Sequence, residues 1–183
     1  MPTTMSRVTK GLTPRRRENL AKLATYLEGL SKRYEHFSMR VFAANFTDVV
    51  EYGLKNGGVE KYGCGTIACA VGHGPAAGIL VTPSHLEGKD DIDWFSYTAA
   101  NFLGAWKPFE FEDHIYSQPH LFAWLFGEAW ADVDNHHHGA AARIRYLLAG
   151  NDLPEDLLKH DNGDADCWEP KPRHRKLYKE FRK

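Results

Sequence analysis

Apolar residues recur at helical spacing after the Thr13-Pro14 pair, which predicts the first helix of the chain. A threonine followed by proline favours a helix start, because the threonine side chain caps free N–H groups and proline needs no partner at the first position. The apolar positions are Leu20, Leu23, Ala24, Leu27 and Leu30. They share one face of a 3.6-residue period, so we expect an amphipathic helix packed on a core.

Three later stretches also have helical patterns. Asp93–Leu103 is moderately amphipathic, and the stretch from Pro119 to Trp130 is apolar over most of its circumference. Ala140–Ala149 has its apolar residues on one side and is followed by Gly150, a typical helix terminator. We therefore expect a central core helix after Pro119 and two amphipathic helices around it.

Weaker patterns predict several short elements, and clear strand signals are few. The expected ranges are strands at 34–44 and 79–82, and helices or helical turns at 46–54, 67–73 and 154–159. The sequence thus predicts a mostly α fold, a compact single-domain helical fold with at most a few short strands.

Length and charge divide the chain into three parts. Its 183 residues suit one domain, which we place at 13–160, after a polar leader at 1–12 and before a linker and basic C-terminal tail at 161–183. From Lys171 onward seven Lys and Arg residues face a single acid, whereas the net charge of the chain is −1. Nucleic acid is therefore an unexpected partner except through the basic tail, for which a disordered, solubilising role is favoured.

The short apolar stretches and the few cysteines indicate where in the cell the protein is expected. None approaches the ~20 residues that span a bilayer, and the first residues have no apolar core of a secretory signal. The cysteines Cys64, Cys69 and Cys167 are too few for a disulfide framework, so we expect them to be reduced. A cytoplasmic location with no membrane partner is expected.

The segment 62–75 concentrates the candidate chemistry. It holds Cys64, Gly65, Thr66, Cys69 and His73 at the start of an expected short helix. If Thr66 caps that helix, the free N–H groups of 67–69 point outward beside glycines, and a ligand can approach the backbone closely. This arrangement predicts a cradle for an anion.

Other interpretations of the same segment stay open. The small residues can simply allow close helix packing, with both cysteines as buried small side chains. Cys69 and His73 share a helix face, so a nucleophilic thiol with a histidine base is a second alternative. Cys64, Cys69 and His73 are also plausible zinc donors, but their spacing fits no standard module, so we expect no metal and no cofactor.

Further candidate ligand residues lie elsewhere in the chain. Trp94, Tyr97 and Trp130 are aromatic rings that can stack on a base. Arg143 and Arg145 are two apart on one expected helix, so at most one faces an inner pocket, and Arg143 is our candidate. Consecutive histidines cannot all face one metal ion, so we expect His136–His138 to form a solvated or pocket-edge cluster, with His137 as a ligand contact.

The chain resembles a broad family of uncharacterised proteins common in bacteriophages and bacteria. The resemblance covers roughly residues 14–150, and it implies provenance rather than a particular chemistry. The matching positions are Cys64-Gly65-Thr66, Cys69, Gly72 and His73, with Phe102-Leu103-Gly104, Leu125-Phe126-Gly127, Trp130 and the helix at 141–145.

These observations favour a binding protein over an enzyme. We expect a phage-type protein that sequesters a phosphorylated or nucleotide-like small molecule, with a possible role against host defence and with homo-oligomers left open. The alternatives are a cysteine-dependent hydrolase or transferase that uses Cys69 and His73, and a factor that binds a host protein through the basic tail.

Overall fold

The computed structural model is mostly helical, with 60% of the described residues in helices and 3% in strands, which confirms the mostly α class. It describes residues 12–34, 37–39, 68–87, 91–104, 119–160 and 168–183. The helix expected at 46–54 and most of the expected leader and linker lie outside these residues. Among the described residues, no helix is long and apolar enough to cross a membrane.

The first helix, α1, spans Pro14–Gly29 as the sequence predicts. Thr13 is its N-cap, and the Thr13 hydroxyl accepts a hydrogen bond from the Arg16 N–H at 3.3 Å. The predicted apolar face is buried against the rest of the molecule. Its fully buried members are Leu20, Leu23, Ala24 and Leu27.

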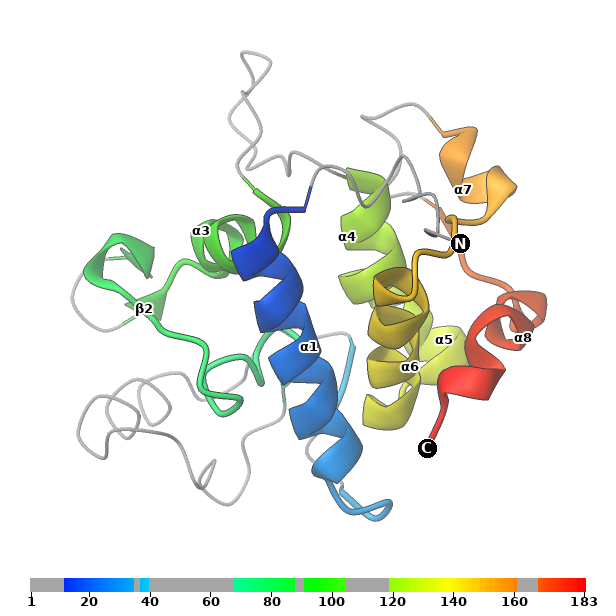
Figure 1. The fold of residues 1–183 in the computed structure, drawn as a ribbon, viewed down its shortest axis with the longest axis horizontal. Coiled ribbons are helices and arrows are strands. Elements are labelled where there is room, and N and C mark those ends of the chain that lie inside the picture. The colour runs from blue at the N-terminus through cyan, green and yellow to red at the C-terminus, as the bar shows by residue number, and fades with distance from the viewer. Residues whose placement is uncertain (1–11, 35–36, 40–67, 88–90, 105–118, 161–167) are drawn as a thin grey trace.

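Helix α6, His137–Leu148, packs beside α1, and α4, Pro119–Phe126, packs against α6 (Figure 1). α6 starts three residues before the predicted Ala140, because His136 serves as its N-cap. It ends where Gly150 adopts a φ of +88°, a left-handed conformation that glycine adopts without strain. These three helices surround the central part of the core.

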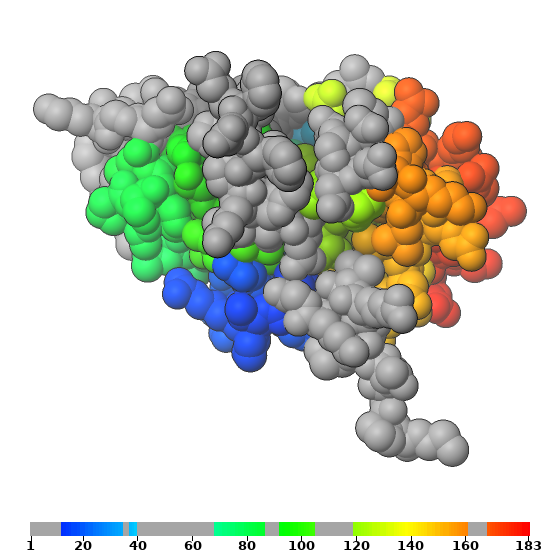
Figure 2. Space-filling view, turned by 90° about the horizontal axis from the view of Figure 1, so that it is seen from above, coloured from blue at the N-terminus to red at the C-terminus, as the bar shows by residue number. Residues whose placement is uncertain are grey.

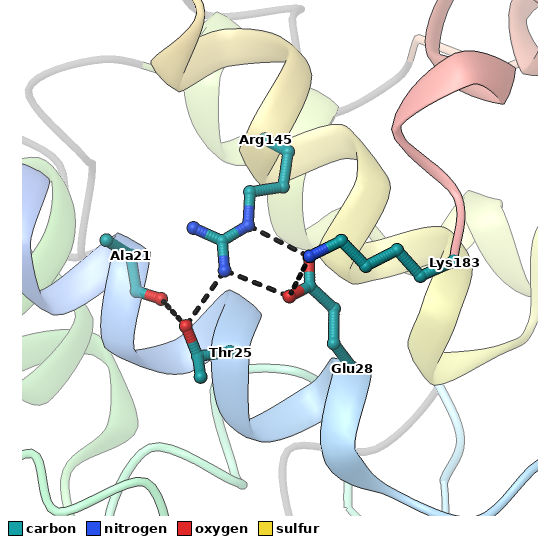
Figure 3. A network of polar contacts seen from close by, with 5 residues as sticks. All are labelled: Ala21, Thr25, Glu28, Arg145 and Lys183. Carbon is teal, nitrogen blue, oxygen red and sulfur yellow. Dashed lines mark hydrogen bonds and ion pairs between the residues drawn. The ribbon is translucent and has the colours of Figure 1, made fainter.

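A network of charged side chains joins α6 to α1 (Figure 3). Arg145 donates two hydrogen bonds to the carboxylate of Glu28, at 2.9 and 3.0 Å, and a third to the Thr25 hydroxyl at 2.8 Å. The ammonium group of Lys183 lies 3.5 Å from the same carboxylate. The Arg145 guanidinium lowers the pKa of Glu28, so this contact favours the ionised pair.

The predicted stretch from Pro119 to Trp130 is divided after α4. Gly127 leaves the helical conformation, and the chain continues as a 3₁₀ turn, η4, over Glu128–Trp130 and a short helix, α5, over Ala131–Asp134. A side chain at Gly127 would meet the Ala123 carbonyl oxygen at 2.6 Å, so the backbone approaches α4 too closely for any other residue.

The described part of the region 79–104 contains the small sheet and three helical segments, the first of which is a 3₁₀ turn, η2, over Pro83–His85. β1, Leu86–Glu87, pairs antiparallel with β2, Asp91–Ile92. The predicted helix at 93–103 is confirmed as α3, Trp94–Thr98, continued by a π-helical turn, η3, over Ala99–Leu103. The expected strand at 79–82 is not formed, because this segment makes no pairing among the described residues.

The predicted helix at 67–73 is wrong for the residues described. Residues 69–78 form consecutive turns after a bridge between Phe37 and Ala68, which is also the only described trace of the strand expected at 34–44. Gly72 and Gly74 weaken helix formation, and Pro75 offers no N–H, so short turn hydrogen bonds replace the helical ladder.

The C-terminal segment, 168–183, is folded rather than a disordered tail. It forms η6 (Pro172–His174), α8 (Arg175–Tyr178) and η7 (Lys179–Phe181), of which α8 and η7 pack against α6. The turn expected at 154–159 appears as α7, Glu155–Leu158. Residues 168–183, red in both views, lie on the opposite side of the molecule from the green residues 68–87 (Figures 1 and 2).

The sequence favoured disorder there because of charge, but apolar anchors and ion pairs hold this segment. Trp168 and Tyr178 are buried. Three of its basic side chains pair with acids of the main domain: Arg173 with Asp156, Arg182 with Asp134, and Lys183 with Glu28.

Candidate ligand site

A cavity of about 260 Å³ lies between α4, α3 and the C-terminal segment. Its walls are mainly aromatic and apolar. The side chains that line it include Met39, Cys69, Phe95, Phe122, Phe126 and Trp168. Phe122 and Phe126 are four residues apart on α4, so both rings point to the same side of that helix. The site is therefore a small aromatic chamber.

One edge of the cavity carries a charged, exposed residue, unlike the aromatic and apolar walls. Glu128 and Ala129 of η4 line it where the chain reaches the surface, and Glu128 is exposed. On another side Met39 separates the cavity from α6. The backbone N–H of Met39 donates to the Asn135 side chain at 2.8 Å, which holds this residue beside the start of α6.

Behind Met39 lies the fully buried side chain of Arg143. Its guanidinium carbon is 4.2 Å from the centre of the Trp130 ring, and Nη2 is 3.8 Å from the Met39 sulfur, which is a weak acceptor. Nε and Nη1 are buried and have no hydrogen-bond partner among the described residues. Burial lowers the pKa of Arg143, and nearby Tyr178 and Asp134 partly offset that effect.

The carboxylate nearest to this region is already engaged. Asp134 Oδ2 accepts hydrogen bonds from the Tyr178 hydroxyl at 2.9 Å and from Arg182 Nη1 at 3.2 Å. The same carboxylate lies against the backbone of Gly139 in α6, where any side chain would collide with it. Asp134 thus holds the C-terminal segment in place, and no described carboxylate pairs directly with Arg143.

Trp168 adds a second buried donor at the cavity. Its ring lines the cavity and lies 5.8 Å, centre to centre, from Trp130. Its indole Nε1 is buried without a hydrogen-bond partner in the part of the chain that the structure describes. The unpaired polar atoms of Arg143 and Trp168 are all donors, and the described residues on this side of the cavity supply no acceptor for them.

The structure gives no support to Cys69 as a nucleophile with His73 as its base. Cys69 lines the cavity, but burial raises the pKa of its thiol to about 11, so the thiolate is scarce at neutral pH. His73 Nδ1 hydrogen-bonds to the Cys69 carbonyl oxygen at 2.8 Å and Nε2 to the Tyr34 hydroxyl at 3.2 Å. The base is thus committed to other groups.

The described part of the predicted anion cradle does not form the helix start on which that prediction depends. Cys64, Gly65 and Thr66 lie outside the described residues, so their role stays a prediction. The residues that follow, 69–73, form turns instead of a helix, so they present no helix N-terminus to a ligand.

The predicted stacking aromatics are core residues. Tyr97 is fully buried and donates to the Ile79 carbonyl at 3.1 Å, and burial raises the pKa of its hydroxyl. Trp130 is also fully buried and donates to the Ala123 carbonyl at 3.1 Å. Trp94 is 6% exposed and packs edge-on against Tyr97. Their faces pack on protein groups in this conformation.

His137 and His138 are buried at the C-terminal end of α1 and His136 is half-buried, so the run does not form the expected solvated edge. His137 is fully buried, with Nδ1 2.9 Å from the Leu27 carbonyl oxygen and Nε2 3.0 Å from that of Ser31. His138 Nε2 faces the Leu30 carbonyl oxygen at 3.3 Å. These rings lie against carbonyls at the C-terminal end of α1, where the Leu27 and Ser31 carbonyls also accept backbone N–H groups.

The same three rings bring possible metal ligands together. One nitrogen of each of His136, His137 and His138 lies within 4.8 Å of the others, which the expectation from consecutive positions did not foresee. However, both nitrogens of His137 already face carbonyls, and His136 Nδ1 accepts the His138 N–H at 3.1 Å. We assign no metal to this cluster.

Sequence reasoning found Arg143 and Cys69 but missed most of the cavity. Of the predicted residues, the structure brings together Arg143 and Trp130, and it places Cys69 on the cavity wall. His73 and His137 lie on either side of a shared neighbour, since both rings contact the ring of Tyr34. The spacing of Phe122 and Phe126, four residues apart, was the sequence signal that could have predicted an aromatic wall.

Comparisons with protein families, curated proteins and solved structures gave no match for this chain. The resemblance of its Cys64–His73 segment to a family common in bacteriophages stays a prediction. Function therefore has to be inferred from the geometry of the cavity and its surroundings.

Proposed function

We propose that this chain is a binding protein for a small molecule whose aromatic ring system, such as a nucleobase, occupies the cavity. The observation that carries the proposal is the group of four rings from Phe95, Phe122, Phe126 and Trp168 around one cavity. Aromatic walls favour flat, apolar ligand surfaces by dispersion and by offset or edge-on ring contacts.

The volume limits the ligand. An apolar cavity of about 150 Å³ holds benzene, and pockets for drug-sized ligands begin at roughly 300 Å³. The value of about 260 Å³ suits one or two fused rings. A nucleotide-like ligand, the class expected from the sequence, would therefore place its base in the cavity and its sugar and phosphates outside.

Binding without turnover fits the surroundings better than catalysis does. The thiol at the cavity is protonated at neutral pH, and the neighbouring histidine is hydrogen-bonded elsewhere. The basic C-terminal segment, the basis of the host-protein alternative, uses three of its charges within the chain.

The test is a melting-temperature screen of the full chain with nucleobases, nucleosides, nucleotides and cyclic oligonucleotides. A ligand that binds only the folded state raises the melting temperature, by an amount that grows with its concentration. Ala129→Phe fills the edge of the cavity and should abolish the rise. Ala149→Phe, an exposed position away from the cavity, is the matched control and should retain it.

Two outcomes contradict the proposal. One is that no aromatic compound in the screen raises the melting temperature of the natural chain. The other is that Ala129→Phe responds to the same compounds as strongly as Ala149→Phe does, which would place binding elsewhere.

A further inference from the structure

The interior beside the cavity holds a positive charge that no carboxylate of the described residues pairs with directly. Arg143 is fully buried, and two of its three guanidinium nitrogens have no hydrogen-bond partner among the described residues. Leaving such a group unpaired is costly, and burying a charge without a partner costs far more than burying a neutral donor. Its described polar contacts are the Met39 sulfur and the Tyr178 hydroxyl, which itself donates to Asp134.

The neighbouring acid does not remove this deficit. Oδ2 of Asp134 accepts hydrogen bonds from Tyr178 and Arg182, so this oxygen serves the C-terminal segment. The cation–π contact with Trp130 stabilises the guanidinium from one face only, and leaves the donors in the plane of the group unpaired.

Met39 connects this charge to the cavity. Its side chain lines the cavity and its sulfur contacts Arg143 Nη2, so a single flexible side chain lies between the two. Methionine has several rotatable bonds and repacks at low cost. A shift of Met39 would open the cavity toward the guanidinium, where Trp168 Nε1 is a further unpaired donor.

We propose that Arg143 is the anion-recognition group of this site: the ligand carries a carboxylate or phosphate group next to its aromatic ring, which displaces the Met39 thioether and pairs with the guanidinium. This inference rests on the proposed function, because it assigns the charge of the ligand bound in the same cavity. Carboxylate and phosphate both match the planar fork of arginine and accept two hydrogen bonds from it.

The exposed Glu128 fixes the orientation of the ligand. A carboxylate at the edge of the cavity repels an anionic group there, whereas the guanidinium attracts it at the inner side. The ring therefore fills the chamber with its anionic substituent directed toward Met39 and away from Glu128.

The test compares two compounds of equal shape, 2-naphthoate and 2-naphthamide, by titration calorimetry on the full chain. A hydrogen bond to a charged group contributes about 1.5–3 kcal/mol, which corresponds to roughly 10- to 100-fold in affinity. We expect naphthoate to bind at least tenfold more tightly. Phenyl phosphate against phenol forms a second pair, which separates a phosphate preference from a carboxylate preference.

Arg143→Met should abolish the preference for the anion and retain binding of the amide. Arg145→Met is the matched control, because it removes an arginine two positions away on the same helix, and the preference should persist. If Arg143→Met does not fold, Met39→Ala decides: it opens the path to the guanidinium and should increase the preference.

The outcomes separate this inference from the proposed function. Equal affinity for the acid and the amide, or a preference that survives Arg143→Met, overturns the role of Arg143 while the cavity remains a binding site. Binding of none of the four compounds counts against both.

Discussion

Arg143 and Arg145 are two positions apart on α6 but have opposite surroundings. Arg145 is partly exposed and has partners for its guanidinium in Glu28 and Thr25 (Figure 3). Arg143 is fully buried, and two of its guanidinium nitrogens have no hydrogen-bond partner among the described residues.

This difference separates two kinds of interface along one helix. On the side of α6 that faces α1, the polar side chains are hydrogen-bonded to carbonyls or to a carboxylate. Their contribution to folding is enough to explain their presence. On the side of Met39 and Trp168, buried donors remain unmatched, and a structural role alone does not account for them.

The largest effect is expected at Asp134. Asp134→Ala removes the acceptor of Tyr178 and Arg182 and the one described acid that acts on Arg143, so we expect a loss of about 3 kcal/mol in the free energy of unfolding. Urea denaturation measures it. Glu180→Ala, an exposed acid of the same segment, should change stability by less than about 0.5 kcal/mol. A loss below 1 kcal/mol at Asp134 would show that the C-terminal segment is held mainly by apolar contacts.

The second prediction contrasts the two arginines directly. Arg143→Met replaces an unpaired buried charge with an apolar side chain of similar length and should stabilise the fold by about 1 kcal/mol. Arg145→Met leaves the largely buried Glu28 carboxylate without its main partner and should destabilise by about 1 kcal/mol. Opposite signs in paired denaturation experiments support the contrast, and equal losses would mean that Arg143 has a structural role like that of Arg145.

A smaller effect is expected at the histidines that join α6 to α1. Two carbonyls beside His137 favour a doubly protonated ring, but burial opposes the charge and dominates, so the pKa of His137 is lowered, as is that of His136. The charges of His138, Arg182 and Asp134 also act on His136. Because the unfolded chain then binds protons that the folded chain does not, stability is full above about pH 6.5 and falls below it.

Urea midpoints at pH 7.5 and 5.5 measure this dependence, and His137→Gln should reduce the difference between them. A higher midpoint at pH 5.5 would contradict the prediction, because it would mean that protonated His137 gains more from its two carbonyls than it loses through burial.

The smallest effect is expected at Lys183. Its ammonium group is 72% exposed and lies 3.5 Å from Glu28, which Arg145 already pairs. Lys183→Ala should therefore cost about 0.3 kcal/mol, and 1 M salt should remove that difference. A cost equal to that of Arg145→Met would show that the ion pair depends on all three charges.

Local signals in the sequence predicted the long helices well. Thr13 and Pro14 determine the start of α1 through backbone chemistry, and Gly150 ends α6 for the same kind of reason. The two arginines also point in different directions, as their spacing required. Such features depend on neighbours within one or two turns of helix, so the sequence reveals them.

Contacts between distant segments were not predictable in this way. The turns at 69–78 follow from tertiary packing, such as the bridge of Phe37 to Ala68, which overrides a weak helical pattern. The cavity unites Met39, Phe95, Phe126 and Trp168 from separate parts of the chain, and no spacing rule connects them. The order of the C-terminal segment depends on Asp134, which charge counting could not select as its partner.

The packing of α1 on α6 also has a consequence for synthesis of the chain. α1 buries its leucines against a helix that ends at Leu148, roughly 120 residues later, and ribosomes add roughly 5–20 residues per second. The apolar face of α1 is thus synthesised roughly 6–25 s before α6 is complete. Over this interval the nascent chain exposes a leucine-rich surface that a chaperone can recognise, and closing so long a loop makes this contact a late event in folding.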